Sequence, residues 1–216
     1  MTFQTINIDT WYRKPYFEHF LHTTPATFSM CANVEISYLL TKARTANVNF
    51  YPMFLYMVTK IVNAHSEFRM DWKEDGQLGY WDKMMPSYTI FHNNSKLFSN
   101  LWTIYDEDFS VFYANYLEDI SVYGAIETLH PKPNAPKNGV PISCIPWTSF
   151  TGFNLNIANG SSYLLPIITS GKFFQDGEKI LLPLAVQVHH AVCDGYHASL
   201  FFNEFQQLAD SCDEWL

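Results

Sequence analysis

The sequence predicts a mixed α/β fold, because stretches with the two-residue period of a strand alternate with stretches that have the period of a helix. Hydrophobic residues make up 48% of the 216 residues and aromatic residues 17%, which is enough apolar material for one sizeable core. No internal repeat, low-complexity stretch or long linker interrupts the pattern. We therefore expect one domain that spans residues 1–216.

The first third of the chain predicts a helix, a strand and a second helix. Residues 10–21 form the first expected helix, with Tyr16 and Phe20 on one face. Residues 27–36 place apolar side chains at every second position, which is typical of a half-buried strand. Residues 49–65 carry a continuous apolar stripe at helical spacing, so this segment predicts a helix with one buried face.

The middle of the chain predicts a hairpin, a strand and a helix. Residues 68–81 contain an Asp-Gly pair, which supplies the positive backbone angles that tight hairpin turns require. Residues 87–92 predict a strand. Residues 106–124 predict an amphipathic helix, whose acidic first turn suits the positive end of the helix dipole.

The last third predicts two strands and a closing helix. Before them, residues 130–147 contain five prolines and a glycine, which argues against regular structure over most of this stretch. Residues 161–169 and 179–190 are the expected strands, joined through a second Asp-Gly pair, and residues 196–210 are the expected helix. The segment between the last strand and that helix is therefore a strand end followed by a turn.

Composition excludes several classes of function. The 13 Lys and Arg residues against 21 Asp and Glu residues give a formal charge of -8, and no basic run could neutralise a nucleic-acid backbone or an anionic membrane. No apolar run approaches the roughly 18 residues that span a bilayer, and the first residues lack the order of a signal peptide. The four cysteines have no paired CxxC spacing, so we expect reduced thiols in a cytoplasmic protein.

Two adjacent histidines, His189 and His190, end the last expected strand. Successive side chains of a strand point to opposite faces, so the two imidazoles cannot both enter one small site. We expect one of them to act chemically and the other to pack. Asp194 follows His190 across a turn, so both side chains can belong to one site without touching.

The residues of this segment leave four interpretations open. A metal site would use both histidines of the doublet, Asp194 and His197, but strand geometry splits the doublet and HEXXH is absent. A dyad of Cys193 and His190 lacks the known cysteine-protease signatures. In a structural interpretation the histidine is a hydrogen-bonded core residue and Asp194 caps the helix. In the fourth, a neutral imidazole, whose ordinary pKa is about 6.5, takes a proton from a hydroxyl that attacks an acyl carbon.

The segment "HHAVCDG" has the form HHxxxDG and resembles the signature of the CoA-dependent acyltransferase superfamily. Four further stretches occur in the order and at the separations of the type A chloramphenicol acetyltransferases: "WYRKPYFEHF", "NFYPMFLYMV", "SCIPWTSFTGFNLNIAN" and "YLLPIIT". The resemblance runs from Trp11 to the closing helix, which is nearly the whole chain. It implies an α+β two-layer sandwich, in which helices cover a mixed, mostly antiparallel sheet.

The resemblance implies a catalytic role for five residues. His190 matches the general base that takes the proton from a primary hydroxyl of chloramphenicol while that oxygen attacks the thioester carbonyl of acetyl-CoA. Ser143 matches a serine that donates to the oxyanion of the tetrahedral intermediate, and Thr169 a threonine that orders a water nearby. Asp194 matches an aspartate that pairs with an arginine, here Arg13, and maintains the architecture of the site. Each residue also has an ordinary structural interpretation, such as a loop serine or a helix cap.

The resemblance also implies the residues of two binding pockets. The apolar walls around the acceptor match Phe20, Ala26, Phe98, Leu155 and Ile167. Some family members carry Tyr at the first of these positions and Cys at the second, so this pocket loses a hydroxyl and gains a little volume. Trp147 and Lys172 match the lining of the CoA channel, whereas Asn49 stands where a second lysine is often found.

Members of the family are homotrimers, so the resemblance implies that the histidine of one subunit faces a pocket completed by its neighbour. It implies acetyl-CoA as co-substrate, no metal, and resistance to the antibiotic as the biological outcome. One alternative is the catalytic core of a dihydrolipoyl acyltransferase, although a first helix near Trp11 leaves no room for a lipoyl domain and its linker. Another is a non-catalytic relative that binds the drug without turnover, although all five catalytic residues are intact.

Overall fold

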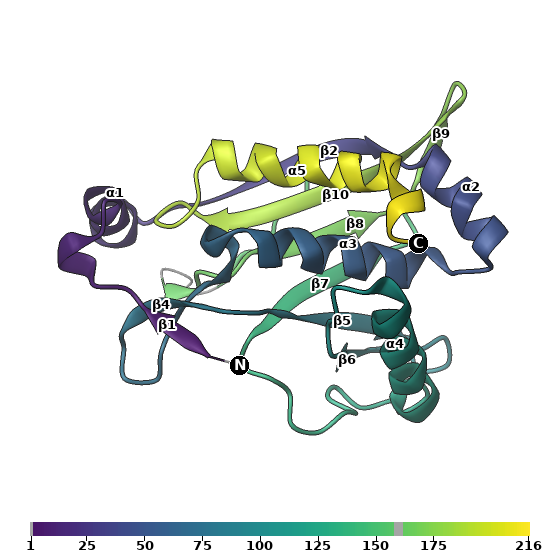
Figure 1. The fold of residues 1–216 in the computed structure, drawn as a ribbon, viewed down its shortest axis with the longest axis horizontal. Helices are drawn as coiled ribbons and strands as arrows, with labels where there is room; N and C mark the ends of the chain where they lie inside the picture. Colours follow the sequence, from purple (N-terminus) through teal and green to yellow (C-terminus); the bar gives the residue numbers. More distant parts are fainter. Residues whose placement is uncertain (1, 158–161) are drawn as a thin grey trace.

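A seven-stranded mixed sheet forms the centre of the molecule, in the order β2-β10-β8-β7-β5-β6 with β9 paired to β10 (Figure 1). The computed structural model describes residues 2–157 and 162–216. The strands of this sheet are β2 (Thr27–Glu35), β5 (Met85–Phe91), β6 (Phe98–Trp102), β7 (Gly139–Ile145), β8 (Ile167–Gly171), β9 (Phe174–Asp176) and β10 (Lys179–His189). Neighbouring strands are antiparallel except for the pairs β5·β7 and β7·β8. The mixed, mostly antiparallel fold that we expected is confirmed.

A smaller antiparallel sheet and a set of helices complete the described chain. The small sheet has the order β1-β4-β3, with β1 (Phe3–Thr5), β3 (Met70–Trp72) and β4 (Leu78–Trp81). The helices are α1 (Lys14–Glu18), α2 (Ser37–Ala46), α3 (Phe50–Ala64), α4 (Phe109–Tyr123) and α5 (Gly195–Asp210), with the short helical turns η1 (Ile8–Thr10), η2 (His19–Thr23), η3 (Ser66–Arg69) and η5 (Cys212–Glu214). No described helix has the length and apolar character that a membrane span needs.

Helices α3 and α5 lie side by side across one face of the large sheet, where they cover the core (Figure 1). The rings of Phe54 in α3 and Phe205 in α5 are 5.9 Å apart. In α3 the residues from Pro52 to Thr59 are all buried, not only those on one stripe. A helix that is apolar on all sides is stable only when it is enclosed, and α3 is enclosed by the sheet, α4 and α5.

Both Asp-Gly pairs lie at the hairpin turns that we predicted. Gly76 connects β3 to β4 with φ 81°, and Gly177 connects β9 to β10 with φ 59°. These backbone angles are readily adopted only by glycine, so the two pairs fix the register of their hairpins. Strand β2 runs from Thr27 to Glu35, as the apolar alternation predicted, and pairs with β10 over this length.

The first predicted helix is shorter than expected and turns a different face to the core. It comprises α1 and the π-helical turn η2. Tyr16 points outward and is 59% exposed, whereas Phe17 is 2% exposed and packs against Trp11 and Trp72. The prediction placed Tyr16 and Phe20 together on one face, but Phe17 and its aromatic neighbours form the contact with the core.

Three segments differ from the sequence prediction in extent. Strand β7 occupies the second half of the proline-rich stretch, where only Pro141 lies inside the strand. Strand β8 begins at Ile167, so residues 162–166 precede it, and Ser161 lies outside the described residues. The helix predicted over residues 106–124 begins at Phe109, so its acidic residues precede the helix. Asp108 caps the helix, because its carboxylate accepts a hydrogen bond from the Ser110 amide.

Candidate active site

The two histidines at the end of β10 have different environments, as the alternation of strand side chains predicted. His189 is the last residue of the strand, is 1% exposed, and accepts a hydrogen bond at Nδ1 from the amide of Ala191 (3.2 Å). His190 begins the following turn, where its amide donates to the carbonyl of Ala26 (2.9 Å), and its side chain is 32% exposed. Of the two imidazoles, that of His190 is the one exposed to solvent.

The imidazole of His190 is held in one orientation and one tautomer. The ring of Phe20 stacks on it with centroids 3.8 Å apart and planes 16° apart, and the edge of Phe28 lies 5.2 Å away. Its Nδ1 lies 3.1 Å from the carbonyl oxygen of Cys193. A carbonyl oxygen only accepts hydrogen bonds, so Nδ1 carries the proton of the neutral ring and Nε2 carries the lone pair. This is the arrangement that a general base needs.

Arg13 binds the turn that carries His190. Its guanidinium donates to both carboxylate oxygens of Asp194 at 2.7 Å, and also to the carbonyls of Ala191 (3.0 Å) and His190 (3.3 Å). The hydrogen bonds from Arg13 hold the pKa of Asp194 below its ordinary value. The Arg13 side chain is only 6% exposed, so this bidentate pair fixes the path of the turn.

His197 supports the same turn from the first turn of α5. Its Nδ1 accepts a hydrogen bond from the amide of Asp194 (3.0 Å), and its Nε2 lies 3.8 Å from a carboxylate oxygen of Glu67. We had considered His197 only as a metal ligand. The signal for its actual place is the capping-box spacing, in which the third helical residue reaches back to the residue that caps the helix.

The His197 contact predicts a pH dependence of stability. Burial, which disfavours the charged imidazole, lowers the pKa of His197. The unfolded chain therefore binds a proton at this residue at a higher pH than the folded chain does, and stability is lost as the pH falls below about 6.5. We expect His197→Gln, which retains an acceptor and does not titrate, to lose less unfolding free energy than the native protein between pH 7 and 5. Equal losses in urea melts of both proteins would contradict this prediction.

A cavity of about 910 Å³ lies on the other half of the sheet and contains most of the predicted pocket residues. Ser143 of β7 and Thr169 of β8 are directly paired in the sheet and both line it. The predicted residues that line this cavity are Phe98, Ser143, Trp147, Leu155, Ile167, Thr169 and Lys172. Those that do not line it are Arg13, Phe20, Ala26, His190 and Asp194. The predicted site thus falls into two groups within one chain.

The strand register gives the distance between these two groups along β10. Thr169 pairs with Ala185 on β10, whereas His190 lies five residues further along the chain. At about 3.3 Å per residue, the two levels are roughly 16 Å apart. An imidazole and the Ser143 hydroxyl cannot both reach one acyl carbon across that separation.

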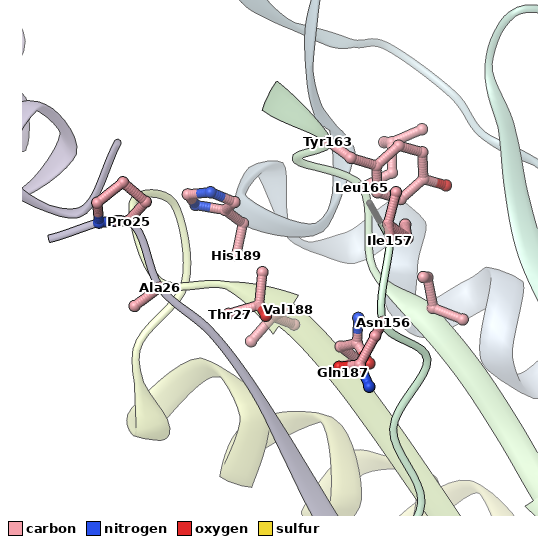
Figure 2. A pocket seen from close by; sticks show the side chains of 11 residues that line it. Pro25, Ala26, Thr27, Asn156, Ile157, Tyr163, Leu165, Gln187, Val188 and His189 are labelled. Carbon is pink, nitrogen blue, oxygen red and sulfur yellow. The ribbon is translucent and has the colours of Figure 1, made fainter. Parts of the chain in front are cut away.

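A smaller cavity of about 190 Å³ lies between the two groups (Figure 2). Ala26 and His189 line it on the side of the histidine turn, and Ile167 lines both this cavity and the large one. Gln187, which faces Asn156 here, donates to and accepts from the backbone of Leu155, with both distances 2.7 Å. Gln187 was not predicted as a site residue, although it is the one polar side chain in "ILLPLAVQV".

The structure also bears on the two other chemical interpretations of the histidine segment. Burial raises the pKa of the Cys193 thiol well above its ordinary value, and its Sγ donates to the carbonyl of Glu67 (3.4 Å). A protonated, buried thiol is a poor nucleophile, which argues against a Cys193 dyad. Within residues 2–157 and 162–216, no three His, Cys, Asp or Glu side chains gather as a metal site would require.

The chain is similar to known proteins of one family. The family model described as chloramphenicol acetyltransferase matches residues 1–206. The chain belongs to the chloramphenicol acetyltransferase family. A chloramphenicol acetyltransferase from Clostridium perfringens is 53% identical over 216 residues, which is 100% of this chain and 99% of the relative.

Solved structures give the same family and a wider group that shares the fold. A chloramphenicol acetyltransferase structure superposes with a TM-score of 0.86 at 25% identity, over 96% of this chain and 100% of the other. A dihydrolipoamide acetyltransferase from Azotobacter vinelandii superposes with a TM-score of 0.61 at 15% identity, over 93% of this chain and 87% of the other. The second likeness concerns the fold alone.

Proposed function

We propose that this protein transfers the acetyl group of acetyl-CoA to a primary hydroxyl of chloramphenicol and so inactivates the antibiotic. The observation that carries the proposal is His190, whose Nδ1 faces the Cys193 carbonyl and whose ring is stacked on Phe20, which leaves Nε2 free to accept a proton. Membership of the chloramphenicol acetyltransferase family supports the choice of substrates. We infer that the reaction takes place in the cytoplasm, where acetyl-CoA is available.

In the proposed reaction His190 Nε2 takes the hydroxyl proton while the hydroxyl oxygen forms a bond to the thioester carbon. The carbonyl electron pair moves to oxygen, and the Ser143 hydroxyl donates a hydrogen bond to the resulting oxyanion. When the intermediate collapses, the C–S bond breaks and the CoA sulfur receives the proton from His190. Thr169, next to Ser143 in the sheet, orders a water near the oxyanion. Arg13 and Asp194 act through His190, as positioning residues.

We propose that each site forms between two copies of the chain in a homotrimer. The separation of roughly 16 Å along β10 supports this assembly, because His190 and Ser143 of one copy are too far apart to act on one acyl group. Strand β2 lies at an edge of the large sheet, beside the turn of His190. An edge strand has free backbone groups that a neighbouring chain can pair with.

In the proposed assembly the pocket residues bind the two substrates. The acceptor binds against Phe20, Ala26, Phe98, Leu155 and Ile167. The large cavity receives acetyl-CoA beside Trp147 and Lys172, both of which are exposed at its rim. Trp147 is held by the ring of Phe91, with centroids 4.6 Å apart. An apolar cavity of this volume suits a large ligand that is fixed by a few polar groups.

The proposed function is tested by the release of CoA thiol from acetyl-CoA with two acceptors, chloramphenicol and dihydrolipoamide. We expect turnover with chloramphenicol and little or none with dihydrolipoamide. The opposite preference would favour a dihydrolipoyl acyltransferase, whose fold this chain shares. Tight binding of chloramphenicol without thiol release would instead favour a non-catalytic, drug-binding relative.

A further inference from the structure

Two lysines of the described chain, Lys96 and Lys172, have neither a carboxylate partner nor an aromatic ring beneath them among the described residues. Seven other lysines form ion pairs, and Lys83 lies over the ring of Tyr105. Lys96 and Lys172 both line the cavity of about 910 Å³, and both are exposed. The uncompensated lysine charges of this acidic protein are therefore gathered at one cavity.

The sheet places both lysines at the same edge. Strands β5, β7 and β8 run parallel to one another and end at Phe91, Ile145 and Gly171. Lys172 directly follows β8, and Lys96 lies in the turn between β5 and β6. Because the ends of parallel strands meet at one edge of a sheet, the two ammonium groups flank the same mouth of the cavity.

The backbone of Lys96 is in an uncommon conformation for a lysine. Its φ is 59°, in the left-handed region, where glycine and asparagine fit with the least strain. The other two positive-φ residues in the described chain that are not glycine are both asparagine, Asn47 and Asn134. The backbone conformation of this turn therefore does not account for a lysine at this position.

We propose that Lys96 binds a phosphate group of the nucleotide end of acetyl-CoA, together with Lys172 across the mouth of the cavity. This inference rests on the proposed function, which makes acetyl-CoA the co-substrate. The nucleotide end carries a pyrophosphate and a 3′-phosphate, and these anions approach a protein whose formal charge is -8. Two unpaired cations at the mouth offset that repulsion and attract the phosphates locally.

The test is the affinity for CoA of the variant Lys96→Asn, measured by isothermal titration calorimetry at low ionic strength. Asparagine removes the charge and suits the left-handed backbone, so the variant is expected to fold as well as the native protein. We expect the Kd of CoA to rise about threefold to tenfold, the KM for acetyl-CoA to rise by a similar factor, and kcat and the KM for chloramphenicol to change less than about twofold. The difference in Kd should shrink as salt screens the charge.

Lys73→Asn is the matched control, because it removes the same charge from a hairpin turn, where Lys73 pairs with Asp75 and does not line the cavity. Pantetheine, which lacks the nucleotide, should bind the native protein and Lys96→Asn equally, and 3′-dephospho-CoA tells which phosphate Lys96 contacts. The proposal is overturned if Lys96→Asn binds CoA as the native protein does, or if pantetheine weakens by the same factor. A native protein without turnover would instead refute the proposed function, and the CoA affinities would still decide the role of Lys96.

Discussion

Replacement of His190 by alanine should lower kcat for acetyl transfer to chloramphenicol by about 10³-fold or more, with little change in either KM. The variant removes Nε2, the one basic atom that the histidine turn offers to a substrate, and leaves the Arg13–Asp194 pair intact. The stacked ring of Phe20 loses its partner, so the melting temperature is expected to fall slightly. The measurement is the rate of thiol release at equal concentrations of folded protein.

His189→Gln is the control for this variant. His189 is buried and accepts a backbone hydrogen bond, so its replacement should lower stability more than it lowers kcat. The reverse pattern, with His189→Gln inactive and His190→Ala active, would assign the chemistry to the other ring. Equal activity of native protein and His190→Ala would contradict general-base catalysis by this residue.

Ser143→Ala should lower kcat by about 10²- to 10³-fold, the usual effect of removing one hydrogen-bond donor to an oxyanion. Because the bond forms fully only in the tetrahedral intermediate, the KM values for acetyl-CoA and chloramphenicol should change little. Ser121→Ala, on the exposed surface of α4, is the matched control and should behave as the native protein. A Ser143→Ala variant that raises KM and retains kcat would make Ser143 a binding residue, without a role in the transition state.

The regular elements with strong local patterns could be predicted from the sequence, and the weakly patterned ones could not. Helix α3 and strand β10 have long apolar runs, and Asp-Gly pairs mark the β3–β4 and β9–β10 hairpins. Helix α2 was missed because it follows β2 directly, with Ile36 in place of a capping side chain. Strand β7 was obscured by its prolines, and β6 is a short edge strand whose pairing with β5 stabilises it.

The site, too, could be predicted only in part from the sequence. The separation of the two histidines follows from strand alternation, but the contact between Arg13 and Asp194 joins residues 181 positions apart. Only the resemblance to a family paired them in advance. Gln187 acts through the backbone of Leu155, which no residue pattern reveals, whereas the contact of His197 with the Asp194 amide has a signal in the capping-box spacing. The division of the site into two groups depends on strand register, which becomes known only with the fold.

The proposed two-copy site can be tested by combining two inactive variants. In a trimer of His190→Ala and Ser143→Ala chains, a site is intact when its histidine comes from a Ser143→Ala chain and its serine from a His190→Ala chain. In a ring of three copies that contains both variants, this holds at one of the three interfaces, so about a third of the sites are intact. Two affinity tags, one on each variant, allow purification of trimers that contain both.

The decisive measurement is therefore thiol release by doubly tagged trimers with acetyl-CoA and chloramphenicol. If each active site takes His190 and Ser143 from different copies, trimers that contain both variants should recover about a third of the native activity, while each variant alone stays nearly inactive. If the mixed trimers are no more active than the separate variants, His190 and Ser143 of the same copy must act together, and the two-copy site is wrong.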